Sequence, residues 1–110
     1  MSTIKELATQ VHNTALKKGF WDRACNFGEK IALVHSELSE ALEAFRCSKP
    51  GVPLIPSNKT PAFNAVEEEL ADAVIRILDL CEYSGFDIEG AILAKMAFNE
   101  GRPHLHGKQF

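Results

Sequence analysis

The sequence predicts an all-α fold, and two observations support this prediction. Apolar residues recur at the three- and four-residue spacing of amphipathic helices, whereas the alternation typical of strands is nearly absent. The 110 residues, 45% of them hydrophobic and 25% charged, fit one globular domain over residues 1–110. We expect four helices joined by one long irregular connection. Because so small a domain leaves much of its surface uncovered, oligomerisation would hide further apolar area.

Two similar start signals predict the first two helices. A polar capping residue is followed three residues later by glutamate in both places, Thr3 with Glu6 and Asn26 with Glu29. The first helix should begin at Ser2 or Thr3 and end before Gly19. The second should run to about Arg46. The segment SKPGVPLIPSNKTPA follows and holds four of the five prolines, which excludes regular helix or a central strand, so we expect a long loop over about residues 48–62.

The second half of the chain predicts two more helices. The third should begin near Pro61 or Asn64 and end at Gly85, a residue type common just after a helix. Asp87 should cap the fourth, which runs to about Glu100. The last ten residues read as a polar, basic tail. A loop as long as the one before the third helix is uncommon in a compact domain, so it should serve a function or contact a partner subunit.

Charge and cysteine content exclude several classes of function. The formal net charge is −3 and the basic residues are scattered, which argues against a nucleic-acid partner. No apolar stretch is long enough for a membrane span or resembles a signal peptide core, so the expected location is the cytoplasm, without a membrane partner. Cys25, Cys47 and Cys81 are odd in number and widely spaced, which suggests reduced thiols rather than disulfides or a zinc knuckle.

The acidic residues of the second helix are unusually placed. On a helical wheel Glu37 falls between Leu33 and Ala41 inside the apolar arc, and Glu40 lies at its edge. Neither has a basic residue three or four positions away, so local ion pairs do not explain them. The solvated face lies on the opposite side and carries polar residues, His35, Ser36, Ser39, Glu43 and Arg46.

The third helix opens with the acidic stretch VEEELAD, Val66 to Asp72. Glu67 and Glu68 are explained by the positive end of the helix dipole. Glu69 and Asp72 instead lie at the edge of the apolar face, and Asp72 has Arg76 four residues later as a helical partner. Glu69 has no such partner.

Local effects thus leave four acidic residues without a full explanation. They form one E-x-x-E pair, Glu37 and Glu40, and one E-x-x-D pair, Glu69 and Asp72, each on one helical face. If the faces meet, four carboxylates share a partly buried site, which is too costly unless protons or cations neutralise them. Oxygen ligands favour Mg²⁺ or Mn²⁺, and a pair of such ions suits phosphate chemistry. A di-iron bundle is the alternative metal site, but it uses Glu-x-x-His, which is absent. No nucleophile elbow or Gly-rich phosphate loop is present either.

E-x-x-E, a gap of 28 residues and then E-x-x-D resembles the MazG-like all-α NTP pyrophosphohydrolases over most of the chain. The family pattern often begins with an acidic doublet, and Ser36 stands here at its first position. The resemblance implies a four-helix bundle in which Glu37, Glu40, Glu69 and Asp72 hold Mg²⁺, or Mn²⁺ in its place.

Further matches concern the substrate. KMAFNEGR resembles a family segment that contacts phosphates and supplies Lys95, Asn99 and Arg102, and Arg76 is also expected to bind substrate. A second group resembles the base pocket of the dCTP pyrophosphatase branch: His12, Trp21 and, beside it, Phe20. Each also has a plain structural explanation, since a lone Trp is commonly core and basic residues favour a last helical turn.

The resemblance implies hydrolysis of a nucleoside triphosphate, a deoxynucleotide such as dCTP included, to the monophosphate and pyrophosphate. Glu37 or Glu40 would orient or deprotonate the attacking water. It also implies a homo-oligomer, a tetramer or a dimer, with sites near subunit contacts. Two alternatives stay open: a related bundle that acts on phosphoribosyl-ATP, and a non-catalytic helical module that binds partners through the Pro-rich loop and the tail.

Overall fold

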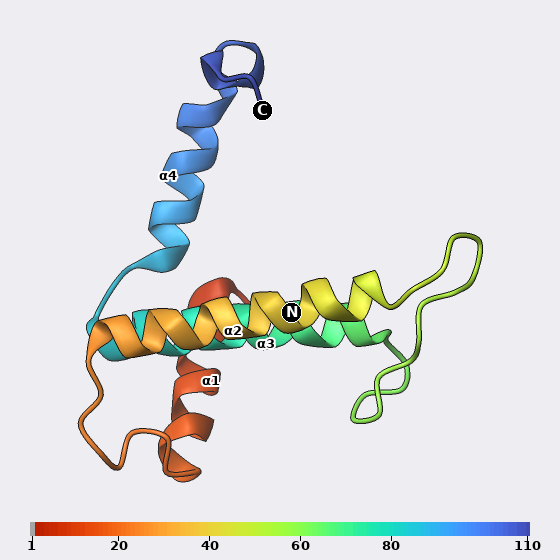
Figure 1. Cartoon of the computed structure of the whole chain (residues 1–110). Coiled ribbons are helices and arrows are strands. Elements are labelled where there is room, and N and C mark those ends of the chain that lie inside the picture. Colours follow the sequence, from red (N-terminus) through yellow and green to blue (C-terminus); the bar gives the residue numbers. More distant parts are fainter. Residues whose placement is uncertain (1) are drawn as a thin grey trace.

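The structure is a computed structural model that describes residues 2–110 of the chain. This range is all-helical and contains no β-sheet, which confirms the predicted all-α class and the four helices (Figure 1). The elements follow in the order α1 Ile4–Lys17, α2 Phe27–Arg46, α3 Ala65–Ser84, α4 Ile88–Glu100 and a short 3₁₀ turn, η1, at His104–Gly107. None of the helices in this range is long and apolar enough to cross a membrane.

Local capping interactions fix the helix boundaries close to the predicted ones. The Asn26 side chain accepts a hydrogen bond from the Glu29 backbone N–H at 2.7 Å and opens α2. A full capping box between Asn64 and Glu67 opens α3, so this helix starts at Asn64 and not at the alternative, Pro61. Gly85 ends α3 in the left-handed conformation, at φ 73°, where a residue without a Cβ is favoured.

The packed part of the chain consists of α1, α2 and α3. Helices α2 and α3 lie side by side and antiparallel, and α1 crosses α3 (Figure 1). Ala8 of α1 and Ala73 of α3 are both buried, and such small side chains let two helices approach closely. The other buried apolar residues come from α2 and α3: Val34, Ala41, Leu78, Leu80 and Cys81.

Helix α4 does not close a four-helix bundle within this chain. It extends away from the α1–α3 layer (Figure 1), and none of its residues is buried. Its contact with α1 includes a hydrogen bond in which the Lys5 backbone N–H donates to Glu89 Oε1 at 3.3 Å. Leu93, Met96 and Phe98 are all exposed along α4. The predicted tail also folds in part, as the turn η1.

The apolar stripes predicted for the core are only partly covered. Leu42 of α2 is 60% exposed and Val74 of α3 is 52% exposed, although the helical wheel places both on apolar faces. Leu38 and Leu70 are exposed as well. The periodicity identified apolar faces correctly, but a single copy of the chain does not supply enough partners to bury them.

The Pro-rich connection is irregular, as expected, but its second half is tied to α3. Ser57 is only 3% exposed, and its Oγ donates to Glu68 Oε2 at 2.6 Å. The same Oγ accepts hydrogen bonds from the backbone N–H groups of Lys59 and Thr60 at 3.2 and 3.1 Å. We call this arrangement the Ser57 clamp. The sequence explained Glu68 by the helix dipole alone, whereas the structure shows that Glu68 also accepts a hydrogen bond from Ser57.

Candidate functional site

Packing of α2 against α3 brings three of the proposed metal ligands together. Glu37 and Glu40 from α2 and Glu69 from α3 each offer a carboxylate oxygen, and these oxygens lie within 4.8 Å of one another. Glu37 is buried, with 9% of its surface exposed, whereas Glu69 is half-buried and Glu40 is exposed. The two acidic pairs therefore belong to one cluster that opens to solvent at Glu40.

Asp72 stands one helical turn after Glu69, outside the tight group of three. Its pKa is raised by burial and by the negative charges of Glu37 and Glu68, while Lys59 and Arg76 oppose the rise. Asp72 thus experiences the charge of the cluster, and it lines the same pocket as Glu37.

Among the carboxylates of the cluster, Glu69 is the one whose pKa is raised most clearly. Burial raises its pKa to about 7, and the neighbouring carboxylates of Glu40 and Asp72 add to the rise. Within residues 2–110 its buried Oε2 has no hydrogen-bond partner. A proton on Glu69 or a cation beside it would relieve both problems. The donor set consists of oxygens alone, which fits a hard cation such as Mg²⁺ or Mn²⁺.

Arg76 favours the ionised form of Glu37. Its Nε donates to Glu37 Oε1 at 2.8 Å, across the α2–α3 contact. Burial would raise the pKa of Glu37, but the hydrogen bond and the charge of Arg76 hold that pKa below its usual value. The sequence placed Arg76 four residues after Asp72, and the charge of Arg76 does act on the pKa of Asp72, but its short contact is with Glu37.

A second polar cluster lies beside the carboxylates and includes two of the predicted base-pocket residues. Asp79 of α3 accepts hydrogen bonds from Trp21 Nε1 at 3.0 and 3.1 Å and contacts His12 Nδ1 at 2.7 Å. Tyr83 stacks on the Trp21 ring with centroids 3.9 Å apart, and Lys30 Nζ lies 4.0 Å from the Trp21 centroid. Because Tyr83 occupies one ring face, Lys30 must cover the other.

This cluster changes the predicted role of Trp21. A ring covered on both faces offers no platform for a nucleobase unless Lys30 moves, so Trp21 in this structure holds Asp79 and Tyr83 in place. Sequence reasoning missed Asp79. The signal was available, because Asp79 follows Asp72 by seven residues and so lies on the same face of α3.

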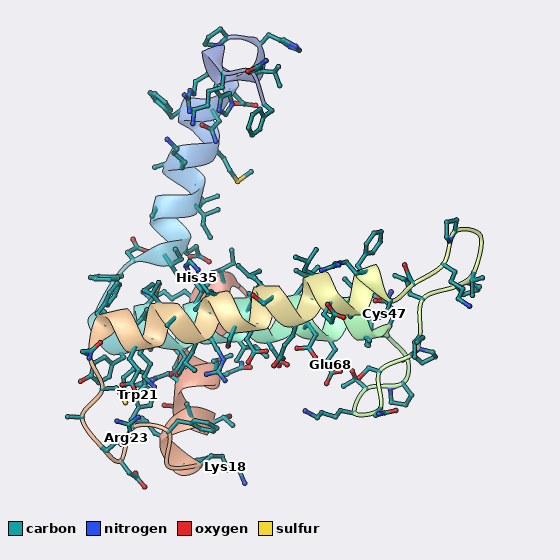
Figure 2. All side chains as sticks on the ribbon, viewed as in Figure 1. Lys18, Trp21, Arg23, His35, Cys47 and Glu68 are labelled. Carbon is teal, nitrogen blue, oxygen red and sulfur yellow. The ribbon has the colours of Figure 1, made fainter. Side chains whose placement is uncertain are left out.

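A pocket of about 340 Å³ is lined by Glu37 and Asp72 and by Asp79 of the second cluster, whereas its lining does not include Glu40 or Glu69. Residues of α1, α2, α3 and the Pro-rich loop line it. Phe20 is among them, whereas His12 and Trp21 reach the pocket only through Asp79. The charged residues of the lining are Lys18, Lys30, Glu37, Lys59, Asp72, Arg76 and Asp79. Lys18, which lines the pocket, lies on the opposite side of the α2–α3 pair from His35 (Figure 2).

The structure does not bring the predicted phosphate contacts of α4 to this pocket. Lys95 Nζ and the Arg102 guanidinium lie over the Phe98 ring, 4.8 and 5.5 Å from its centroid. Asn99 is half-buried, and its Oδ1 has no hydrogen-bond partner within residues 2–110. Because α4 extends away from α2 and α3, these three residues stand apart from the carboxylates of their own chain (Figure 1).

Replacing Asp79 with Ala should free the Trp21 indole. The chain has one tryptophan, so its fluorescence reports this site alone. We expect Asp79→Ala to shift the emission to the red and to increase quenching by acrylamide, because the indole N–H loses its acceptor and the ring becomes solvated. Asp22→Ala, beside Trp21 but exposed, is the matched control. Unchanged emission in Asp79→Ala would contradict the geometry.

Glu69 should make the metal-free protein lose stability as pH rises. The folded protein keeps the Glu69 proton up to about pH 7, whereas the unfolded chain loses it near the ordinary value of 4.5. The folded state therefore binds more protons between these values, and the free energy of unfolding falls across this window. Asp72, whose pKa is also raised, acts in the same direction.

Urea titrations with a chelator at about pH 5 and about pH 8 measure this difference. Glu69→Gln should reduce it, and Mg²⁺ should restore stability to the wild-type protein at the higher pH. A chelated wild-type protein that gains stability between the two pH values would show that Glu69 is not the crowded, protonated group.

No protein-family model matches the chain, and neither a curated protein nor a solved structure matches it. The features that bear on function are three converging carboxylates, an arginine that holds one of them ionised, and an adjoining pocket with basic residues in its lining.

Proposed function

We propose that the protein is a MazG-like nucleoside triphosphate pyrophosphohydrolase that requires Mg²⁺ or Mn²⁺ and releases a monophosphate and pyrophosphate. The observation that carries this proposal is the convergence of Glu37, Glu40 and Glu69 within 4.8 Å, from two facing helices. Mutual repulsion and burial both oppose the ionised form of carboxylates placed so close together, and a cation would offset both. Arg76 neutralises only one of the three.

The proposed ligands are Glu37, Glu40 and Glu69, with Asp72 completing the set. Divalent ions bound there would lower the pKa of a water molecule and offset charge that develops on the phosphates. Glu69 Oε2 fits this role, since a cation would give it the partner that it lacks among residues 2–110. Oxygen ligands alone do not suit zinc or a di-iron centre.

The two glutamates of α2 have different surroundings, which favours Glu40 as the general base. Glu37 is buried, and its Oε1 already accepts a hydrogen bond from Arg76, so it has little access to a water molecule. Glu40 is exposed at the mouth of the cluster and forms no ion pair within the described residues 2–110. A proton acceptor must reach the water that attacks phosphorus, and only Glu40 combines nearness to the cluster with free access.

The nucleoside would occupy the pocket beside the carboxylates. Its volume of about 340 Å³ falls in the range of small-molecule sites. Phe20 offers an aromatic surface there, and Asp79 offers an acceptor for an amino group of a base. This arrangement moves base recognition from the Trp21 ring to Phe20 and Asp79, while the preference for dCTP or another deoxynucleotide remains part of the proposal.

Assembly into a homo-oligomer, a dimer or a tetramer, belongs to the same proposal. Exposed apolar residues on α2, α3 and α4 support it, because such surface is costly in water unless another copy covers it. A neighbouring copy would then supply the phosphate contacts, from Lys95 and Asn99 of its α4 and from Arg102 just after that helix. This explains how residues far from the carboxylates of their own chain could still serve a site.

Glu40→Gln should reduce pyrophosphate release from the preferred nucleotide by at least about a hundredfold, because it removes both a ligand charge and the proposed base. The measurement is a panel of dNTPs and NTPs with Mg²⁺, with helicity followed by circular dichroism. Glu43→Gln, one turn further on and outside the cluster, should keep wild-type activity.

Phosphoribosyl-ATP is included in the panel, since turnover of that compound alone would favour the related bundle. No pyrophosphate from any compound would favour a non-catalytic helical module and end the hydrolase proposal.

A further inference from the structure

The basic residues that line the pocket outnumber the acidic ones. Its lining has four basic residues: Lys18, Lys30, Lys59 and Arg76. Arg76 is bonded to Glu37, and Lys30 lies over Trp21, with its Nζ 3.5 Å from the Phe20 carbonyl oxygen. Lys18 and Lys59 have no such fixed position.

The ammonium group of Lys59 makes only a weak ion pair. Its Nζ lies 4.0 Å from Glu68 Oε1, and the side chain is 84% exposed. An exposed pair at that distance contributes little, because water screens it and the lysine side chain loses entropy when fixed. Glu68 already accepts the 2.6 Å hydrogen bond from Ser57, so it does not depend on Lys59. The Lys59 ammonium can therefore leave Glu68 for a better partner at little cost.

The backbone of Lys59, in contrast, is fixed. Its N–H donates to the buried Ser57 Oγ in the Ser57 clamp. On either side of the loop tip, the Ser57 N–H donates to the Phe63 carbonyl at 2.9 Å and the Ala65 N–H donates to the Ile55 carbonyl at 2.8 Å. The clamp thus joins the loop to the first turn of α3 and holds the base of the Lys59 side chain beside the pocket. Only the side chain needs to move to meet a ligand.

Charge balance indicates what that ligand would be. Cations bound by the carboxylate cluster would be neutralised largely by the cluster itself, so a phosphate chain in the pocket would need further positive groups. The positive charge of Lys59 already acts on Asp72, because it opposes the rise in the pKa of that carboxyl group. Lys18, at the end of α1, lines the same pocket and forms no ion pair in the described part of the chain.

We propose that Lys59, positioned by the Ser57 clamp, and Lys18 form an anion subsite that holds the phosphate chain of the ligand beside the carboxylate cluster. The subsite rests on the proposed function for its place in a reaction, but it binds polyphosphate whether or not hydrolysis follows. It uses residues of the same chain and is therefore distinct from the contacts proposed for Lys95 and Arg102.

Calorimetric titration with inorganic tripolyphosphate and Mg²⁺ tests the subsite directly. Lys59→Gln should weaken binding by about tenfold, the effect of losing one charge-assisted hydrogen bond. Lys59→Arg should retain most of the affinity because it keeps the charge. Lys49→Gln is the matched control, a basic residue that is exposed in the same Pro-rich segment and outside the pocket, and it should bind as the wild type does.

Ser57→Ala examines the positioning. It should weaken tripolyphosphate binding, and it should add little to the effect of Lys59→Gln in the double variant, because both changes remove the same contact. Equal affinities of Lys59→Gln and Lys49→Gln, or a wild-type protein that does not bind tripolyphosphate, would overturn the proposal.

The outcomes also separate the subsite from the enzyme. Tripolyphosphate binding that depends on Lys59, without hydrolysis of any nucleotide, would keep the subsite and reject the hydrolase. Hydrolysis with an unchanged KM in Lys59→Gln would keep the hydrolase and reject the subsite.

Discussion

The antiparallel contact between α2 and α3 is the constraint on which the other features depend. It sets Glu37 and Glu40 opposite Glu69, so that three carboxylate oxygens lie within 4.8 Å. Negative charges so close, and partly out of water, cannot all remain ionised and unpaired. The protein meets this constraint in two ways within its own chain: Arg76 pairs with Glu37, and the pKa of Glu69 rises to about 7. A cation bound by the cluster, as proposed above, would be a third way.

The surroundings divide the carboxylates of α3 and α2 by role. Asp79 is held by His12 and Trp21 in the wall of the pocket. Glu68 is satisfied by Ser57 and fixes the Pro-rich loop. Among residues 2–110, Glu40 forms no ion pair and Glu69 Oε2 has no hydrogen-bond partner, and both residues belong to the cluster of three. The acidic residues of α2 and α3 thus differ mainly in the partners that surround them.

Sequence reasoning predicted the helices well because caps are local. Asn26, Asn64 and Gly85 act through residues no more than a few positions away, and these interactions are legible in the sequence. The helical wheel also placed Glu37 on the buried side. It could not predict that Arg76 would choose Glu37, 39 residues away, over Asp72, since that choice depends on how two helices pack. The stacking of Tyr83 on Trp21 and the direction of α4 also depend on contacts between residues far apart in the sequence. The helical wheel identified the apolar face of each helix, but it could not predict which of these faces another helix of the same chain would cover.

The most direct measurement is the anomalous scattering of Mn²⁺ in crystals grown with a nonhydrolysable dNTP. If the carboxylate cluster is a metal site, anomalous density lies between α2 and α3, with oxygens of Glu37, Glu40, Glu69 and Asp72 as its ligands at about 2.0–2.3 Å. The phosphate chain then lies against that density. Crystals with nucleotide bound elsewhere, and a protonated Glu69 bonded to Glu40 with no anomalous density between them, would contradict the central claim.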